Sequence, residues 1–168
     1  MKTIDTLVED IYNLFEPSII NQISEKDLEK HLKEFTKSVT NNISIVLNEQ
    51  PRKKRRLSLS SIGKPTRQLW YDKHSSSEAR PLAPSTRIKF LYGHILEDLL
   101  ILLSRVAGHT VTEEQKQVEV EGIKGHQDCK IDGALVDCKS ASGYAFKKFA
   151  NNRLAESGVP LDMYYLHE

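Results

Sequence analysis

Apolar residues recur at helical spacing over the first 49 positions. The first run ends at Pro17, and the second follows Ser24-Glu25-Lys26-Asp27, which resembles a helix capping box. The inward positions are Ile4, Leu7, Val8, Ile11, Leu14 and Phe15 in the first run and Leu28, Leu32, Phe35, Val39, Ile43, Val46 and Leu47 in the second. This pattern predicts two amphipathic helices. We expect residues 1–50 to form a helical segment that packs as a cap on the rest of the chain, with a partner-binding arm as the alternative.

The longest predicted helix begins at Pro84 and ends near Ala107, where Gly108 stops it. Its expected inward residues are Ile88, Leu91, Ile95, Leu96, Leu99, Leu103 and Val106. A glycine inside a helix costs about 1 kcal/mol relative to alanine, so Gly93 is expected to mark the close approach of another backbone. Glu97 lies one turn further along the same face. It is either a metal ligand at a sheet edge or an ordinary exposed glutamate.

Strand signals follow this helix. Residues 110–121 predict a strand that turns at Glu121-Gly122. A second turn signal, Asp132-Gly133, lies within residues 125–139. Both central residues of a type I′ turn have positive φ, which Asp-Gly tolerates, so this stretch predicts a hairpin.

Pairing outward from the second turn places Asp128 opposite Asp137 and His126 opposite Lys139. Side chains alternate between the two faces of a strand, so all four project from one face. The other face is expected to join the core through Cys129, Ile131, Ala134, Val136 and Cys138.

Length and composition describe one globular domain, and the order of helix, strands and helix along the chain predicts a mixed α/β (α+β) class. A chain of 168 residues is long enough for a domain with a core. Its longest apolar run falls short of the roughly 20 residues of a membrane span, and its acidic N-terminus lacks the apolar core of a signal peptide. We therefore expect no membrane partner and a cytoplasmic location. The two cysteines, Cys129 and Cys138, are expected to be small buried residues in a reducing compartment.

Charge is unevenly distributed, although the net charge is only +1. Residues 1–50 carry nine acidic and five basic side chains, whereas residues 52–73 carry eight basic and one acidic. This asymmetry predicts an anionic partner for the middle segment. It contains the consecutive basic residues Arg52, Lys53, Lys54, Arg55 and Arg56. They form a contact to a phosphate backbone, a nuclear localisation signal or a solvated linker, and we favour the phosphate contact because basic residues continue beyond them.

Serines and a short predicted helix follow this basic run. Hydroxyl and cationic groups there and after the hairpin are candidate DNA contacts: Ser61, Lys64, Arg67, Lys147 and Lys148. Trp70 and Tyr71 offer aromatic faces for packing or stacking, and the simplest interpretation of Leu69 and Trp70 is that they are core residues.

The predicted hairpin face carries the chemistry. Directly opposed residues have Cβ atoms about 5 Å apart, so two carboxylates there repel unless something offsets them. A divalent cation such as Mg²⁺ would do so, because it takes carboxylate oxygens together with water and phosphate. Lys139, on the same face as Asp137, could stabilise charge developing on a phosphate. The arrangement predicts metal-assisted phosphodiester hydrolysis, and a solvated sheet surface is the alternative.

Three blocks together resemble the RecB-like branch of the PD-(D/E)xK nuclease superfamily, which includes phage exonucleases and RecB-like nucleases of CRISPR systems. The blocks are Ser60-Ser61-Ile62-Gly63 with Arg67-Gln68-Leu69-Trp70-Tyr71, Gly93-His94-Ile95-Leu96-Glu97, and Gly125-His126-Gln127-Asp128 with Asp137-Cys138-Lys139. They span residues 58 to 142. Their order and spacing are far more specific than the last block alone.

The resemblance implies a restriction-endonuclease-like core over residues 51–168, with a central mixed sheet flanked by helices. It implies that Glu97, Asp128, Asp137 and the backbone carbonyl of Cys138 bind Mg²⁺ or Mn²⁺, and that Lys139 is the catalytic lysine. His94 and His126 are expected in supporting positions next to the site or the DNA. Relatives with an iron–sulfur cluster have a cysteine where this chain has Thr66, so we expect no cluster.

The family also carries a Gln-x-x-x-Tyr motif on a helix after the lysine strand. The sequence reaches Glu168 without it, so we expect the core to be truncated before its last helix. The implied function is a metal-dependent DNA exonuclease of bacterial or phage recombination, repair or DNA turnover, with a recombination or replication protein as a further partner. An endonuclease, a catalytically inactive DNA-binding module and a helical interaction domain are the alternatives. A nuclear location is expected only if residues 51–56 are a localisation signal.

Overall fold

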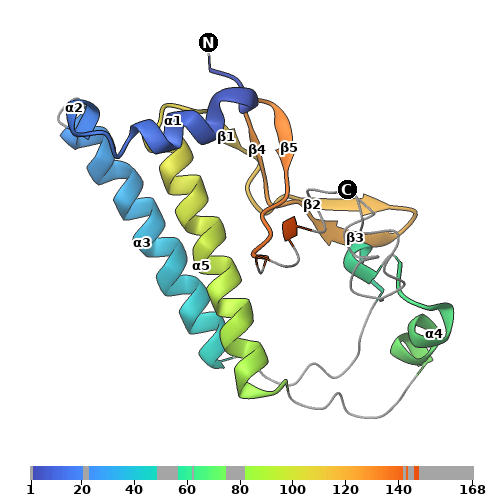
Figure 1. The fold of residues 1–168 in the computed structure, drawn as a ribbon. Coiled ribbons are helices and arrows are strands. Elements are labelled where there is room, and N and C mark those ends of the chain that lie inside the picture. The colour runs from blue at the N-terminus through green and yellow to red at the C-terminus, as the bar shows by residue number, and fades with distance from the viewer. Residues whose placement is uncertain are drawn as a thin grey trace. The chain divides into compact units, whose positions relative to one another are not determined.

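The computed structural model describes residues 2–20, 23–48, 57–61, 63–74 and 82–141, together with residues 143, 146 and 147. Arg52 to Arg56 and Lys148 therefore lie outside the described residues. The chain divides into two compact units (Figure 1). The first comprises Met1–Glu49, Leu82–Lys116 and Gln127–Lys139, and the second comprises Gln50–Pro81, Gln117–His126 and Ser140–Glu168.

The described residues combine helices with small antiparallel sheets, which confirms the mixed α and β class. The helices are η1 (Ile4–Thr6), α1 (Leu7–Asn13), α2 (Pro17–Ile20), α3 (Glu25–Asn48), η2 (Leu59–Ser61), α4 (Thr66–His74) and α5 (Pro84–Val106), where η marks a 3₁₀ helix. The strands are β1 (Val111–Thr112), β2 (Gln117–Val120), β3 (Ile123–His126), β4 (Cys129–Ile131) and β5 (Ala134–Val136). None of the described helices is long and apolar enough to cross a membrane.

Local signals set the ends of the two long helices as predicted. The Ser24 hydroxyl accepts a 3.5 Å hydrogen bond from the Asp27 backbone N–H and so caps α3. At the end of α5, Gly108 has a φ of +86°, which glycine adopts without a steric penalty. The N–H of Gly108 donates to the Arg105 carbonyl, and the N–H of His109 donates to the Ser104 carbonyl. These two bonds form a Schellman motif, which satisfies carbonyls that the helix end would leave unpaired.

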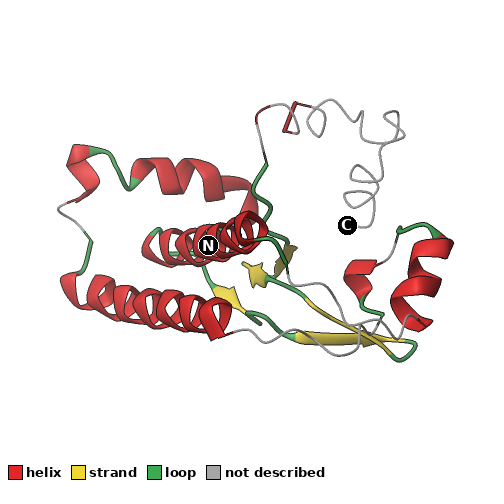
Figure 2. Cartoon of the chain, turned by 90° about the horizontal axis from the view of Figure 1, so that it is seen from below, coloured by secondary structure: helices red, strands yellow, loops and turns green. Residues whose placement is uncertain are grey.

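Within the first unit, α3 lies alongside α5, as both Figure 1 and Figure 2 show. Asp98 of α5 joins the two helices, because its carboxylate accepts hydrogen bonds from Ser38 at 2.7 Å and from Asn42 at 2.9 Å. Arg105 also reaches Glu34, at 3.2 Å. Residues 25–48 are therefore helical, as predicted, and α3 packs on α5 within this unit.

The sheet of the first unit has the strand order β1-β4-β5, and all its pairs are antiparallel. Cys129 pairs with Val136, and Ile131 with Ala134, which is the register expected from the turn. Asp132 and Gly133 have φ values of 51° and 86°, so both adopt the left-handed conformation of a type I′ turn. Cys129 and Ile131 are fully buried in a core formed with Leu7 and Ile101. The predicted core face of the hairpin is therefore confirmed.

The second unit holds the β2–β3 hairpin, whose turn at Glu121-Gly122 is confirmed by φ values of 49° and 77°. His126 pairs with Gln117 in this hairpin, so the prediction that it lies opposite Lys139 is wrong. The β4–β5 ladder ends at the Cys129–Val136 pair, so it does not extend to residues 126 and 139. Close packing also occurs on β3 itself. A Cβ at Gly125 would lie 2.8 Å from Leu59, so only a glycine lets β3 approach η2 this closely.

The single strand predicted over residues 110–121 is interrupted. Glu113 and Gln115 have φ values of 54° and 48°, and the chain turns between β1 and β2. The Glu113 carboxylate binds Lys116 and Lys130, each at 2.9 Å. Its hydrogen bonds to Lys116, Lys130 and Gln127 lower the pKa of Glu113 to about 2. These contacts hold a turn that strand periodicity does not predict.

Several expectations for the helices are wrong because of tertiary packing. The side chain of Ile88, expected inside, is 66% exposed, and the buried residues of α5 are Ile101, Leu102 and Ser104. No described atom outside the local backbone lies within 4 Å of a Cβ built on Gly93, so no other backbone of the described residues approaches there. Trp70, expected in the core, is 56% exposed.

Candidate functional site

Four of the predicted site residues meet at the open end of the β4–β5 hairpin. The Asp128 carboxylate accepts a 2.7 Å hydrogen bond from the backbone N–H of Cys138. This bond crosses from the residue before β4 to the segment after β5, and it places Asp128 beside the Asp137-Cys138-Lys139 tripeptide. Lys139 Nζ donates to Asp137 Oδ1 at 2.6 Å. The turn residues 132 and 133 set this arrangement, because they fix which residues of the two strands face each other.

Glu97 adds a third carboxylate from α5. Its side chain is 13% exposed, and Oε1 accepts a 2.5 Å hydrogen bond from the Gln115 side chain. The Gln115 backbone N–H in turn donates to the Asp128 carbonyl at 2.8 Å, so one residue links the helix to the hairpin. Burial raises the pKa of Glu97, and the negative charge of Asp128 raises it further, against the opposing effect of the Gln115 hydrogen bond. Glu97 is therefore a partly buried carboxylate. Of the two alternatives from the sequence, an ordinary exposed glutamate is excluded.

The raised pKa leads to a stability prediction. A carboxyl whose folded-state pKa is raised favours the folded protein at low pH, and this contribution is lost as the pH rises through the folded-state value. We expect Glu97→Gln to raise the free energy of unfolding in EDTA at neutral pH, because it removes a charge that burial disfavours. The gain should disappear below about pH 4, where the wild-type carboxyl is also neutral. Urea unfolding of wild type and variant, monitored by circular dichroism at neutral pH and below pH 4, measures this gain and its loss.

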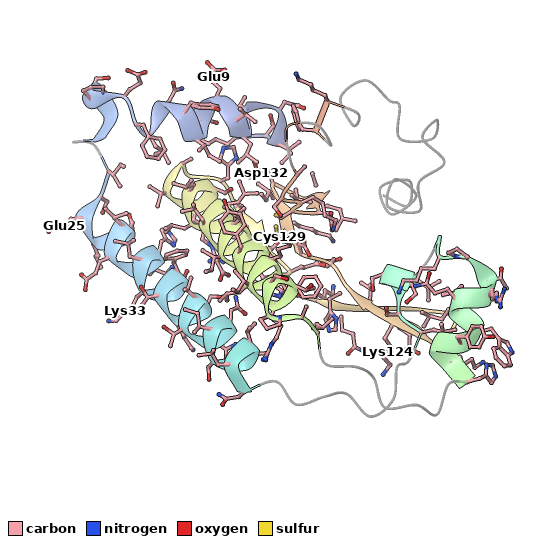
Figure 3. The ribbon with its side chains drawn as sticks, turned by 60° about the horizontal axis from the view of Figure 1, so that its bottom comes forward. Glu9, Glu25, Lys33, Lys124, Cys129 and Asp132 are labelled. Carbon is pink, nitrogen blue, oxygen red and sulfur yellow. The ribbon has the colours of Figure 1, made fainter. Side chains whose placement is uncertain are left out.

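Glu9 on α1 provides the matched control, since it is exposed (Figure 3). Glu9→Gln should leave the unfolding free energy within about 0.5 kcal/mol of the wild type at both pH values. If Glu97→Gln destabilises the metal-free protein at neutral pH, the unfavourable burial assigned to Glu97 is wrong.

The oxygen atoms of these residues are the type of ligand that a hard divalent cation binds. Glu97, Asp128 and Asp137 supply carboxylate oxygens, and the Cys138 carbonyl supplies another oxygen, the ligand type that Mg²⁺ and Mn²⁺ prefer. The charge of Asp128 disfavours ionisation of Glu97, and a bound cation would reverse that effect. In this structure the three carboxylates form hydrogen bonds with other groups of the same chain. Among the described residues, no three carboxylate, imidazole or thiol groups lie close enough together to hold a metal ion.

The two cysteines border these carboxylates, and both are free thiols. Cys129 is fully buried, as expected. A hydrogen bond between the two thiols raises the pKa of Cys138, and burial and the nearby Asp128 and Glu97 carboxylates raise it further. Cys138 is therefore a neutral thiol at physiological pH, and its backbone N–H is the group that bonds to Asp128.

The remaining predicted site residues differ in their placement. His94, half exposed, has Nδ1 3.9 Å from Glu97 Oε2 and so lies next to the carboxylate group. His126 is exposed on β3 in the second unit. The candidate DNA contacts Ser61, Lys64, Arg67 and Lys147 are also described in that unit. The Ser61 hydroxyl lies 3.3 Å from that of Ser58.

Sequence reasoning missed two residues that hold the first unit together. Gln115, described above, has a left-handed backbone that neither helix nor strand periodicity indicates. His109 has a fully buried side chain between two carboxylates. Its Nδ1 donates to Asp132 Oδ2 at 2.6 Å, and the Asp132 carboxylate also accepts the Thr110 N–H at 2.9 Å. The burial of His109 could have been predicted from its position directly after Gly108, because the residue that follows such a helix-ending glycine often packs back on the helix.

Comparison with models of known protein families, with curated proteins and with solved structures gave no match.

Proposed function

We propose that this chain is a metal-dependent deoxyribonuclease of the PD-(D/E)xK superfamily, RecB-like branch, that hydrolyses DNA from its ends. The observation that carries the proposal is the hairpin register, since the Asp128 carboxylate bonds to the backbone between Asp137 and Lys139. Glu97, whose pKa is affected by Asp128, adds the carboxylate that the helix motif predicts. A restriction-endonuclease-like core with a central mixed sheet is part of this proposal, as is a role in bacterial or phage recombination, repair or DNA degradation.

The roles follow from the chemistry of each group. Glu97, Asp128, Asp137 and the Cys138 carbonyl are the proposed ligands of Mg²⁺ or Mn²⁺. When bound, the ion would supply a Lewis acid and lower the pKa of a nucleophilic water. Lys139 orients the Asp137 carboxylate through its hydrogen bond and supplies a positive charge that can stabilise an anionic phosphate. Gln115 holds Glu97 in place.

The test is cleavage of DNA by the full chain. We expect loss of linear duplex or single-stranded DNA from its ends in Mg²⁺ or Mn²⁺, no loss in EDTA, and survival of closed circular DNA. A circle has no end, so cutting of circular DNA would identify an endonuclease of the same superfamily. Unchanged linear DNA with both metals would contradict the proposed enzyme.

An inactive DNA-binding module is the second candidate. It is supported by the excess of basic over acidic residues in positions 52–73, because such a segment can bind a phosphate backbone whether or not the carboxylates are catalytic. This candidate predicts DNA binding that weakens as salt rises, with the DNA left intact even in Mn²⁺. The same incubations, followed by gel analysis of bound and total DNA, separate the two candidates.

A further inference from the structure

Helix α4 of the second unit presents aromatic side chains to solvent. Trp70 is 56% exposed and Tyr71 is 50% exposed. Tryptophan is usually well buried in folded proteins, and neighbouring exposed apolar side chains commonly mark a binding surface. The aromatic face of α4 is defined here as Trp70, Tyr71 and His74.

The rings of this face are held in fixed orientations. The His74 ring stacks on Trp70 with centroids 4.9 Å apart and planes 24° from parallel. His74 Nδ1 lies 2.9 Å from the Trp70 carbonyl oxygen, and because a carbonyl only accepts, Nδ1 carries the proton. Tyr71 meets Trp70 edge to face, with centroids 5.1 Å apart at 87°. Rings that are already ordered lose little conformational entropy when a ligand stacks on them.

Cations accompany the rings. The guanidinium carbon of Arg67 lies 5.9 Å from the centre of the Tyr71 ring, within range of a cation–π contact. Lys73 adds a second positive charge in the last turn of α4, and Asp72 is the only acidic residue of the helix. The surrounding sequence, residues 52–73, has the eight basic residues noted above against this one acid. The charge of the segment is therefore complementary to a polyanion.

Aromatic faces with adjacent cations suit one class of ligand better than others. Bases of a single strand stack on aromatic side chains while its phosphates contact the cations, and this recognition tolerates any sequence. A fully paired duplex keeps its base faces within its own stack. We propose that the aromatic face of α4, with Arg67, binds unpaired nucleotides of single-stranded DNA by base stacking. The use of this surface to hold a nuclease substrate rests on the proposed function, whereas the binding itself requires no cleavage.

Trp70 is the only tryptophan of the protein, so intrinsic tryptophan fluorescence reports directly on this face. Titration of the full chain with a short oligothymidylate in EDTA should give saturable quenching. A blunt, fully paired duplex should quench much less at the same nucleotide concentration. Tyr71→Ala and His74→Ala keep the fluorescent residue, and each should weaken oligothymidylate binding.

The affinity of Trp70→Ala is measured by the anisotropy of a labelled oligothymidylate. Because one base loses its stacking partner, the affinity of Trp70→Ala for oligothymidylate should fall by about five- to hundredfold. Tyr92→Ala is the control, because Tyr92 is 59% exposed on α5 of the first unit. Tyr92→Ala should bind oligothymidylate with wild-type affinity. Circular dichroism establishes that each variant is folded.

No quenching by oligothymidylate, equal quenching by the duplex, or wild-type affinity in folded Trp70→Ala would each overturn the stacking site. The two proposals fail separately. Binding in EDTA that depends on Trp70, without cleavage in Mg²⁺ or Mn²⁺, keeps the stacking site and removes the enzyme. Cleavage of single-stranded DNA by a protein whose oligothymidylate binding in EDTA does not depend on Trp70 keeps the enzyme and removes the stacking site.

Discussion

Lys139→Ala is expected to lower the rate of DNA cleavage by about a hundred- to thousandfold, the loss that follows removal of one group that stabilises transition-state charge. Folding should be nearly unaffected, because the Lys139 side chain is 49% exposed and its partner Asp137 is 33% exposed. Ion pairs this exposed contribute about 0–1 kcal/mol to stability. Metal affinity should also change little, since lysine is not a ligand. The rate and the stability therefore respond separately to this substitution.

The measurement compares initial rates of end degradation under saturating Mg²⁺, with thermal unfolding recorded on the same samples. Lys33→Ala is the matched control, because Lys33 is an exposed lysine of α3 (Figure 3). It should retain wild-type rate and stability. Undiminished cleavage by folded Lys139→Ala would remove the catalytic role assigned to this residue. An unfolded Lys139→Ala protein would show a structural role in its place.

His109→Ala is expected to lower the free energy of unfolding by about 3 kcal/mol, a large part of the roughly 5–15 kcal/mol that stabilises a typical domain. The His109 side chain is fully buried, and the side chains of Asp132 and Asp10 beside it are 10% and 22% exposed. Truncation leaves a cavity and removes the donor that Asp132 uses. His109 Nε2 lies 3.2 Å from Asp10 Oδ2, so the loss also separates α1 from the hairpin turn.

The pH dependence provides a second measurement on His109→Ala. The hydrogen bond from His109, followed by that from the Thr110 N–H, lowers the pKa of Asp132 below its usual value of 3.8. A carboxyl with a lowered folded-state pKa stabilises the protein above its unfolded-state pKa, and this stabilisation is lost as the pH falls through the folded-state value. The wild type should therefore lose stability below about pH 4 more steeply than His109→Ala does. Urea unfolding across this range measures the difference.

The control for this variant is His126→Ala, because His126 is exposed on β3. Its unfolding free energy should stay within about 0.5 kcal/mol of the wild type. If His109→Ala unfolds with the wild-type free energy, the buried cluster of Asp10, His109 and Asp132 does not stabilise the first unit, and its role is then only to fill space.

Features that depend only on neighbouring residues could be predicted from the sequence. The Ser24 cap, the glycine stop of α5 and the turns at Asp132-Gly133 and Glu121-Gly122 all appear as predicted. Each depends on a φ value or a hydrogen bond within a few residues, so the local chemistry is sufficient. The β4–β5 register follows from its turn. The predicted pair of Asp128 and Asp137 lies just beyond this ladder, and the Asp128 carboxylate bonds to the Cys138 N–H there.

Contacts between residues far apart in the chain could not be predicted in this way. Gln115 joins Glu97 to Asp128, and His109 joins α1 to the hairpin turn, through contacts between residues far apart in the chain. The exposure of Trp70 and Ile88 reversed the expectation from apolar periodicity, because periodicity defines the faces of a helix without showing which of them another element covers. Hydrophobic burial has no preferred direction, whereas turns and caps require particular local geometry. The elements and turns were therefore largely predictable from the sequence, and the partners of the buried polar groups were not.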